Sequence, residues 1–416
     1  MGEKTSATQA KIILISMVLG LIMGLLAYSN SWGAVVGVLK PIGGVFISLL
    51  KMMIIPLVLS SIFMAVANLG DPKELGRLGG RSIAYYTLTT VFAAFIGLVM
   101  VNLIEPGVGL NIGELEVEKL SGVIEKRVNM GAEAGLWKTV LGVFLGAVPT
   151  NPIKALAENN ILQVIVFSIL LGIVSLYYRK KADPIISFME SLEFLSMRLV
   201  DWIMYLAPVG IFCLTASVIA ETGFDAISAL SKFVFTVLAG LFIHFAFLLT
   251  LGSWRLKKSP LFILKKCLPV LTTAFSTSSS AATLPITMNT VEDELGVEKK
   301  TAQFILPLGA TINMDGTAIY ESAAVIFIGQ AYGLNLGLTN QIVIFFTASL
   351  AAIGAAAIPG AGLVTMSIVL TAVGFPLEGI GLILAADRIL DMFRTATNVF
   401  GDCVGAITVD SMMKEK

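Results

Sequence analysis

The sequence predicts an all-α polytopic membrane protein with eight transmembrane helices and two re-entrant helical hairpins. Of its 416 residues, 56% are hydrophobic and only 13% are charged, whereas charged residues make up about a quarter of a soluble domain. The mean hydropathy is +0.89. Long stretches without a charged residue recur along nearly the whole chain, which favours one membrane domain over two or three soluble domains.

The balance of residue types excludes several other classes of protein. The 28 basic and 28 acidic residues cancel, so no basic domain is left to bind nucleic acid. The three cysteines, Cys213, Cys267 and Cys403, lie far apart in apolar segments, which supports neither a disulfide framework nor a metal site. A hydrolase would need the single histidine, His244, as its base. We interpret this residue as satisfied by a neighbour or facing lipid, and we predict that the chain is not an enzyme.

Seven runs without Asp, Glu, Lys or Arg approach the roughly 30 Å thickness of the hydrocarbon layer at about 1.5 Å per residue. These runs are 12–39, 52–70, 82–104, 159–178, 202–220, 233–254 and 267–291. No small-residue cleavage pattern follows the first run, so we interpret it as a retained helix. The fourth run follows an apolar piece, 139–153, that contains Pro149 and Pro152. Because proline lacks the amide donor, we expect a broken, multi-part fourth element.

The placement of lysine and arginine predicts the orientation, because basic residues collect in cytoplasmic loops. The loops after spans two, four and six fall on one side and carry Lys73, Arg77, Arg81, Arg179, Lys180, Lys181, Arg255, Lys257, Lys258, Lys265 and Lys266. The opposite connections, 29–39 and 221–231, have no lysine or arginine. Both termini are therefore predicted to be cytoplasmic, and the glutamate-rich stretch 107–136 is predicted to be an extracellular loop.

Two segments after the sixth span predict hairpins that turn at mid-depth. The stretch 322–377 has no charged residue and is too long for one crossing. Glycine and proline at 354–362 interrupt it, and helical arms of about 13 residues would reach only about 20 Å. A similar segment begins at Pro260 and turns at the serine-rich stretch 276–285. A hairpin followed by a helix, repeated from the opposite side, is the inverted-repeat arrangement of secondary transporters.

The last two predicted helices carry ionisable residues at mid-membrane, where a charged group costs a few kcal/mol and usually has a function. The seventh helix is interrupted at 313–316 and contributes Asp315 and Glu321. The eighth helix contributes Asp387, Arg388, Asp391, Arg394, Asn398 and Asp402. At about 100° per residue, all of those on the eighth helix except Arg388 fall within an arc of roughly 80° and form one polar stripe.

These helices carry more acid than base, because five carboxylates face two arginines. A buried charge without a partner is neutralised by a proton or a cation, so the sequence predicts cation binding. Carboxylates, amide oxygens and the carbonyls freed at 313–315 are hard oxygen ligands for an alkali cation. Arg394 can hold a carboxylate as a fork, and the amides at 278–280 can hold a second one. The alternatives are structural ion pairs and a serine-rich turn that serves only packing.

Four segments resemble the signatures of a known family. They are Ser278-Ser279-Ser280, the stretch 313–317, the glycine- and alanine-rich stretch 354–362, and the pattern from Asp391 to Asp402. Their order and spacing are similar to those of the glutamate/aspartate transporters of the dicarboxylate/amino acid:cation symporter family, which include the excitatory amino acid transporters and prokaryotic sodium/aspartate symporters. The resemblance runs from about residue 11 to residue 412. It implies sodium-coupled symport of an acidic amino acid.

The resemblance also implies a homotrimer embedded in lipid, in the plasma membrane or the inner membrane of a bacterium or archaeon. A transport domain would move like an elevator against a fixed scaffold. The scaffold would comprise 11–78, with helices one and two, and 137–224, with helices four and five. The transport domain would comprise 79–106, with helix three, and 225–416, with helix six, both hairpins and helices seven and eight.

Position by position, the resemblance implies a substrate site, in which Arg394 binds the side-chain carboxylate and Asp391 the α-amino group. The substrate site comprises Ser278, Ser279, Ser280, Thr317, Ile358, Gly362, Asp391, Arg394, Thr395 and Asn398. A first sodium site comprises Gly309, Asn313, Asn398 and Asp402. A second comprises Tyr86, Thr89, Thr90, Asn313 and Asp315. A third uses the backbone of Thr311, Met314, Ala352, Ile353 and Ala355.

Two positions depart from the relatives. Glu321 stands where the archaeal aspartate transporters carry glutamine, whereas in mammalian members a glutamate at this place is held to carry a co-transported proton. Apolar surroundings favour the neutral carboxyl, so we expect proton co-transport through Glu321 in addition to sodium, with potassium counter-transport as a further expectation. The extra arginine of relatives is absent at Ser278 and Met392, and Arg388 is therefore the expected partner of Asp391.

Three rival interpretations remain open for a membrane protein of this kind. A proton-coupled C4-dicarboxylate carrier would not need an amine-binding Asp391. A neutral amino-acid exchanger would not need Arg394. An anion channel would need an open pore, which electrical measurement without substrate would detect.

Overall fold

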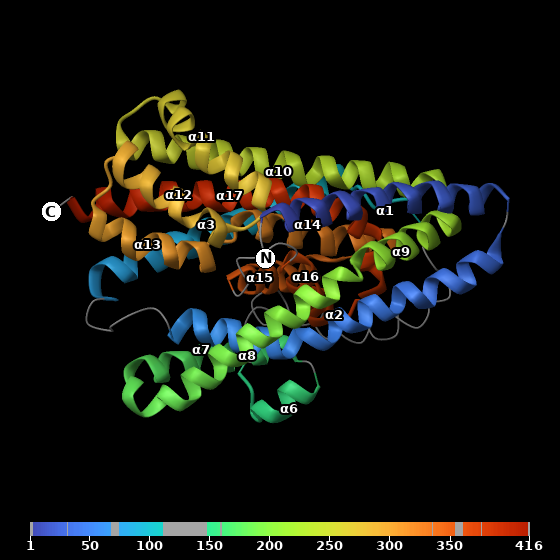
Figure 1. Ribbon diagram of the computed structural model, residues 1–416, viewed down its shortest axis with the longest axis horizontal. Helices are drawn as coiled ribbons and strands as arrows, with labels where there is room; N and C mark the ends of the chain where they lie inside the picture. The colour runs from blue at the N-terminus through green and yellow to red at the C-terminus, as the bar shows by residue number, and fades with distance from the viewer. Residues whose placement is uncertain are drawn as a thin grey trace.

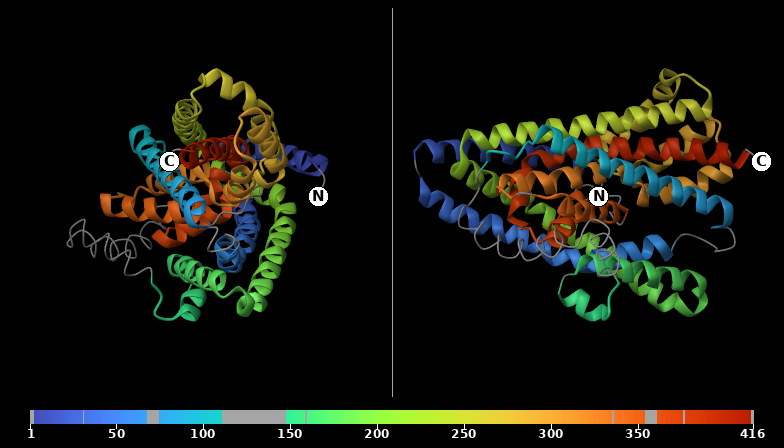
Figure 2. Two further views of the ribbon diagram at one scale, coloured as in Figure 1. Left: turned by 90° about the vertical axis from the view of Figure 1, so that its left-hand side faces the viewer. Right: turned by 180° about the vertical axis from the view of Figure 1, so that it is seen from behind.

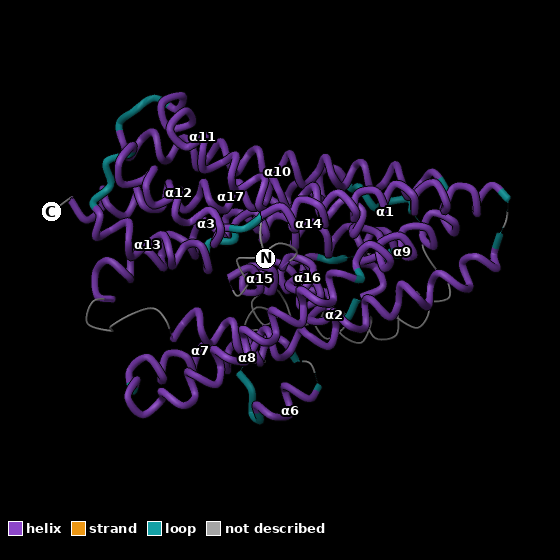
Figure 3. Tube along the Cα trace, viewed as in Figure 1, coloured by secondary structure: helices purple, strands orange, loops and turns teal. Residues whose placement is uncertain are grey.

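The computed structural model describes residues 3–30, 32–67, 75–110, 148–158, 160–334, 336–353, 361–375 and 377–414. Within these residues every regular element is a helix (Figure 3). The helices form an elongated bundle, in which α2, α10 and α17 run along the long axis (Figure 1). The predicted all-α class is confirmed for this part of the chain.

The first charge-free run is divided between two helices. Helix α1 spans Glu3–Ser29 and α2 spans Gly33–Ala67, and the Asn30 side-chain amide donates to the Leu26 carbonyl at the end of α1. The end of the first helix near residue 29 is confirmed, but most of the predicted connection 29–39 belongs to α2. Lys40, which ended that run, lies inside α2 and pairs with Glu221 at 3.1 Å, so its charge is balanced from a neighbouring helix.

The predicted break at Pro149 and Pro152 is confirmed. A short helix, α6, spans Pro152–Ala157, and the Asn151 side chain caps it by accepting from the Lys154 amide. Helix α7 follows at Ile161–Tyr177. The residues 139–147 of the predicted apolar piece lie outside the described residues, as do 111–136 of the predicted extracellular loop.

The charge pattern predicted that the basic residues after α7 lie in a loop, and this prediction was wrong. Helix α8 spans Arg179–Tyr205 and begins with Arg179, Lys180 and Lys181. A polar sequence of this length can form a helix when one face packs, and α8 contacts α2. Helix α9, Ala207–Thr222, follows a bend of 56°, where Pro208 can start a new helix because its missing amide donor is not needed there.

The centre of the bundle is formed by four helices. They are α3, Gly80–Ile104; α10, Phe224–Leu256; α14, Asp315–Ala331; and α17, Ile380–Lys414. The π-helical turn η1, Leu75–Gly79, precedes α3. Nearly every residue of α14 is buried, because α3, α10, α16 and α17 all contact it. The views in Figure 2 place α14 and α17 between α2, α7 and α8 on one side and α10 and α11 on the other.

Both predicted hairpins have two helical arms that contact each other. The first consists of α11, Pro260–Thr277, and α12, Ser280–Asn289, followed by a π-helical turn, η2, at Thr290–Glu294. The second consists of α15, Leu338–Ile353, and α16, Ala361–Val373, followed by a 3-10 turn, η3, at Leu377–Gly379. Its glycine-rich turn, 354–360, lies outside the described residues. The seventh helix is divided into α13, Lys299–Ile312, and α14, as the sequence predicted.

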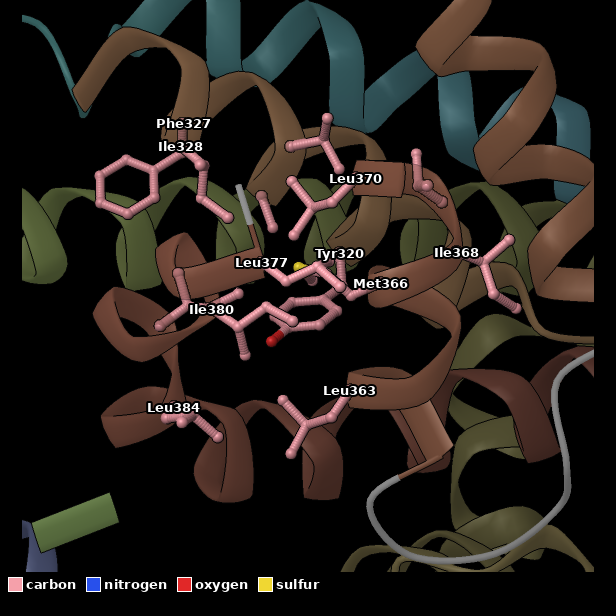
Figure 4. Packing of buried hydrophobic residues seen from close by; sticks show 14 of the residues in the cluster. Tyr320, Phe327, Ile328, Leu363, Met366, Ile368, Leu370, Leu377, Ile380 and Leu384 are labelled. Atoms are coloured by element: carbon pink, nitrogen blue, oxygen red, sulfur yellow. The ribbon is translucent and has the colours of Figure 1, made fainter. Parts of the chain in front are cut away.

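The second arm of the later hairpin packs onto the buried centre. Leu363, Met366 and Leu370 of α16 lie around Tyr320 and Phe327 of α14 in one hydrophobic cluster (Figure 4). This packing fixes α16 beside α14 and α17, which carry the ionisable residues.

The long apolar helices make the chain a multi-pass membrane protein. Among the described residues, Gly37–Met64, Arg77–Ile104 and Phe224–Leu256 are long and apolar enough to cross a bilayer, and the bent pair α8 and α9 provides a fourth candidate. Large apolar side chains such as Phe242 on α10 are exposed on the surface of the bundle, as expected for contact with lipid. The total of eight spans remains a prediction.

Candidate functional site

Arg394 lies at the centre of an acidic cluster on α17. Its side chain is 1% exposed. The Nη2 atom lies 2.7 Å from Asp391 Oδ1 and 3.2 Å from Asp387 Oδ1. Arg388 Nη1 lies 3.5 Å from the other oxygen of Asp391. The predicted partner Arg388 is thus present but distant, and Arg394 is the nearer base.

The opposite side of the Arg394 guanidinium remains available for a ligand. Its Nε and Nη1 atoms are buried and make no hydrogen bond within the described part of the chain. The guanidinium carbon lies 3.9 Å from the centre of the Tyr320 ring, a cation–π contact that holds the plane of the fork. A Cβ atom at Gly362 would lie 2.5 Å from Nη1, so glycine is required for α16 to approach this closely. A ligand carboxylate can accept from the Nη1 N–H groups that the protein leaves unpaired within the described residues.

Glu321 is fully buried on α14, one residue after Tyr320. Neither of its carboxyl oxygens has a regular hydrogen-bond partner among the residues described, although the Thr365 hydroxyl and Arg394 are close enough to act on it. A buried carboxyl without a regular partner is a candidate to bind a proton or a cation.

A second polar cluster forms where α13 ends. Asn313 Nδ2 donates to the Asn398 carbonyl and to Asp402 Oδ1, both at 2.9 Å. Its Oδ1 atom is buried without a partner in the described residues. Asn398 Oδ1 accepts from the Gly316 amide at 2.7 Å. The break between α13 and α14 is therefore held from α17, and hard oxygen atoms gather at it.

Two further oxygen atoms lie close to the backbone at Gly309, one turn before the break between α13 and α14. A Cβ atom there would lie 2.2 Å from Tyr86 Oη and 2.5 Å from Asp402 Oδ1. Tyr86 donates to the Ile305 carbonyl at 3.1 Å, which ties α3 to α13. Carboxylate, amide and carbonyl oxygens in one buried place are ligands that suit an alkali cation.

Asp315 starts α14 and accepts from two other helices. Thr90 Oγ1 of α3 donates to Oδ1 at 2.9 Å, and His244 Nε2 of α10 lies 2.8 Å from Oδ2. Asp315, Thr90 and His244 are all fully buried. The expectation that His244 is satisfied by a neighbour is confirmed, and the alternative that it faces lipid is wrong, because α10 turns this residue toward α14.

The serine-rich turn of the first hairpin has a specific backbone shape. Ser278 adopts a left-handed conformation with φ of 50°, and its hydroxyl is buried without a hydrogen-bond partner in the portion of the chain described. Ser279 caps α12 by accepting from the Ala282 amide at 3.2 Å. Ser280 is the first residue of α12 and is buried. The turn therefore presents a polar surface in the protein interior.

Comparison with known proteins identifies the family. The model of the sodium:dicarboxylate symporter family matches residues 10–412. The chain belongs to this family. Its members are transporters rather than enzymes, which confirms the expectation drawn from the isolated histidine.

Individual relatives cover nearly the whole of this symporter. A proton/sodium-glutamate symport protein of Geobacillus stearothermophilus is 34% identical over 95% of the chain and 92% of its own length. A proton/glutamate-aspartate symporter of Escherichia coli strain K12 is 34% identical over 95% and 91%. An excitatory amino acid transporter of Caenorhabditis elegans is 37% identical over 88% and 79%.

The other residues expected in the sites of the symporter differ in how closely they approach these clusters. Thr317 and Thr395 are buried beside Arg394 and the break. Met314 Sδ accepts from Asn398 Nδ2 at 3.3 Å. The Thr89 and Thr311 hydroxyls donate to carbonyls of their own helices. Ala352 and Ile353 end α15, which contacts α13.

Two expected site residues, Ile358 and Ala355, lie outside the described residues.

Sequence reasoning missed three contributions to the site of the symporter. His244 was not connected with Asp315, from which it is separated by 71 residues. The contact of the Tyr320 ring with the Arg394 guanidinium was not expected. Asp387 was placed on the polar stripe, but its pairing with Arg394 was not predicted. The one available signal was the lone histidine in an apolar span, because an intramembrane ionisable residue usually has a function.

Proposed function

We propose that this protein is a secondary active, sodium-coupled symporter of glutamate and aspartate. The observation that carries the proposal is the half-paired guanidinium of Arg394, buried on the same helix as the Asp402 cluster. The names of the relatives support the substrate class, since they include proton/sodium-glutamate and proton/glutamate-aspartate symporters.

The substrate would bind between α17, α14 and the turns of the two hairpins. The free N–H groups of Arg394 would hold its side-chain carboxylate, and Asp391 would hold its α-amino group. The serine turn at 278–280 would hold the α-carboxylate through backbone amides at the start of α12. The remaining contacts would come from Thr317, Ile358, Gly362, Thr395 and Asn398.

Sodium would bind at the two oxygen-rich clusters and at a backbone site. The first cluster surrounds Asn313 and Asp402, and the second surrounds Asp315 and Thr90. The third would use carbonyls of Thr311 and Met314 and of the end of α15 with the following turn. Asn313 and Asn398 would link ions to substrate, because both hold the break from which α14 starts. Each sodium ion that moves inward contributes about 2.3 kcal/mol per 100 mV, so several ions can concentrate an anion.

Glu321 would carry a proton together with the substrate. Its burial beside Arg394 supports this role, because a carboxyl that stays neutral when the substrate carboxylate is bound avoids a second negative charge at the guanidinium. Potassium counter-transport is the remaining part of the proposed cycle, in which the empty carrier would return with a cation.

Transport would follow an elevator mechanism in a homotrimer, with both termini cytoplasmic. Residues 11–78 and 137–224 would form the scaffold, and 79–106 and 225–416 would form the moving domain. Both hairpins would be re-entrant. The separation of α2, α7 and α8 from α10, α11 and α17 in Figure 1 is compatible with this division.

The proposal is tested by uptake of radiolabelled aspartate and glutamate into proteoliposomes under imposed sodium, proton and potassium gradients. We expect accumulation that requires an inward sodium gradient. Accumulation of succinate driven by protons alone would instead support the C4-dicarboxylate carrier. Uptake of alanine or serine in place of aspartate would support the neutral exchanger, and no accumulation under any gradient would contradict symport.

A further inference from the structure

The hydrogen bonding of Asp315 divides its carboxylate into two sides. Thr90 donates to Oδ1 from α3, and His244 contacts Oδ2 from α10. Thr90 is one of the residues proposed to hold sodium, whereas His244 is not. The Oδ1 side therefore faces the ion, and the Oδ2 side faces an anchor on a different helix.

The contact with Asp315 uses Nε2 of the His244 imidazole as its donor. A carboxylate oxygen can only accept, so Nε2 must carry the proton in this contact. Nδ1 is buried without a partner in the described residues. The Nε2–H group therefore orients the Asp315 carboxylate from α10.

The position of the imidazole is fixed by packing. The ring centroids of Phe92 and Phe247 lie 6.1 and 5.9 Å from that of His244. One turn earlier on α10, a Cβ atom at Gly240 would lie 3.0 Å from Ile319 Cγ2 of α14, so the two helices are in tight contact. His244 has little freedom to follow Asp315, and Asp315 is therefore held by His244.

We propose that His244 is a positioning residue for the sodium ion that binds at Asp315. This inference rests on the proposed function. The Nε2–H group holds Oδ2, so the carboxylate keeps Oδ1 directed at Thr90 before the ion arrives. Without this hydrogen bond, the Asp315 carboxylate would become ordered only when sodium binds. The free energy of that ordering would then be subtracted from the binding free energy, and sodium would bind more weakly.

The test measures sodium binding without transport. The melting temperature of the purified protein is followed against sodium chloride at constant ionic strength, with choline as the replacement ion, because a ligand that binds the folded state raises its stability. The variant His244→Leu removes the donor and keeps an apolar side chain. We expect the sodium concentration that gives the same rise in melting temperature to increase about tenfold, as for the loss of one hydrogen bond to a charged group.

Two further variants separate positioning from packing. His244→Gln keeps a neutral N–H donor and should stay within about threefold of the wild type. Phe242→Leu alters an exposed side chain of the same helix, α10, and should leave the sodium dependence unchanged. A purely structural role would lower the melting temperature in choline for the Leu variant and leave the sodium dependence at its wild-type value, which would overturn the proposal.

The outcomes also separate this inference from the proposed function. If sodium fails to stabilise the wild type at all, sodium coupling is wrong and the inference falls with it. If sodium stabilises the wild type and both His244 variants equally, only the inference is wrong. Should His244→Leu fail to fold, His244→Asn replaces it, since its shorter amide cannot reach Oδ2, and an Asn variant with the sodium affinity of the Gln variant would overturn the positioning role.

Discussion

Arg394 is the residue that we propose selects the substrate by its side-chain carboxylate. Its Nη2 atom pairs with Asp387 and Asp391, whereas Nε and Nη1 have no hydrogen-bond partner among the described residues. This division explains how one residue can anchor α17 and still bind a ligand. An arginine with all of its donors paired would be structural, and one without any partner would be too costly to bury.

Replacing Arg394 should therefore change the substrate class. In Arg394→Cys, aspartate loses its charged partner, and we expect its apparent affinity to fall about a hundredfold or more. Serine and alanine should become the better substrates, because they bring no second carboxylate. Competition assays against labelled aspartate and labelled serine measure the change. Arg198→Cys on the distant α8 is the control, and unchanged aspartate selectivity in Arg394→Cys would contradict the assignment.

Glu321 makes a prediction about pH. If its protonated form is the one that carries substrate, wild-type uptake falls as the external pH rises, because the proton is lost. Glu321→Gln imitates the protonated state at every pH, so uptake in this variant should be nearly independent of pH between about 6 and 9. Glu190→Gln, on the exposed face of α8, should retain the wild-type profile. A Glu321→Gln profile as steep as that of the wild type would exclude this residue as the proton carrier.

Among the elements, the broken helices were the most predictable and the long polar helix the least. Asn313-Met314-Asp315-Gly316 indicated the break between α13 and α14, because these residues favour caps and turns. The helix α8 could not be found from charge-free runs, since it is stabilised by one packed face rather than by apolar composition. The pairing of His244 with Asp315 depends on how α10 lies against α14, which is a tertiary arrangement that no local pattern contains.

The close contact of α13 with α3 and α17 at Gly309 predicts the effect of a substitution there. In Gly309→Ala, the new methyl group would occupy the space between Tyr86 Oη and Asp402 Oδ1, where an ion would bind. We expect sodium stabilisation at this site to be lost although alanine favours a helix by roughly 0.5–1 kcal/mol over glycine. The dependence of the melting temperature on sodium concentration measures this loss of stabilisation. Gly44→Ala on α2, where no atom lies near the new methyl group, is the matched control and should bind sodium as the wild type does. Equal sodium binding by both variants would contradict a sodium site at Gly309 and Asp402.

At the scale of the whole molecule, the central question is whether two groups of helices move against each other. The proposed scaffold and transport domain meet where α9 contacts α17. Here a Cβ atom on Gly381 would lie 3.5 Å from Cβ of Leu214, which is within the range for a disulfide. Leu214 and the adjacent native Cys213 are both buried, so the pair is introduced into a background in which the three native cysteines are replaced by alanine.

Linking these two positions should stop transport while leaving the binding site intact. In the double variant Leu214→Cys and Gly381→Cys, oxidation would join α9 to α17 in the arrangement seen here. Under an elevator mechanism, uptake into proteoliposomes should fall by at least about tenfold on oxidation and recover on reduction, whereas sodium and aspartate should still raise the melting temperature, because the disulfide touches neither Arg394 nor Asp402. Each single cysteine variant, treated with the same oxidant, controls for damage elsewhere. If the crosslinked protein transports as fast as the reduced protein, α9 and α17 do not separate during the cycle, and the division into scaffold and moving domain must be drawn elsewhere.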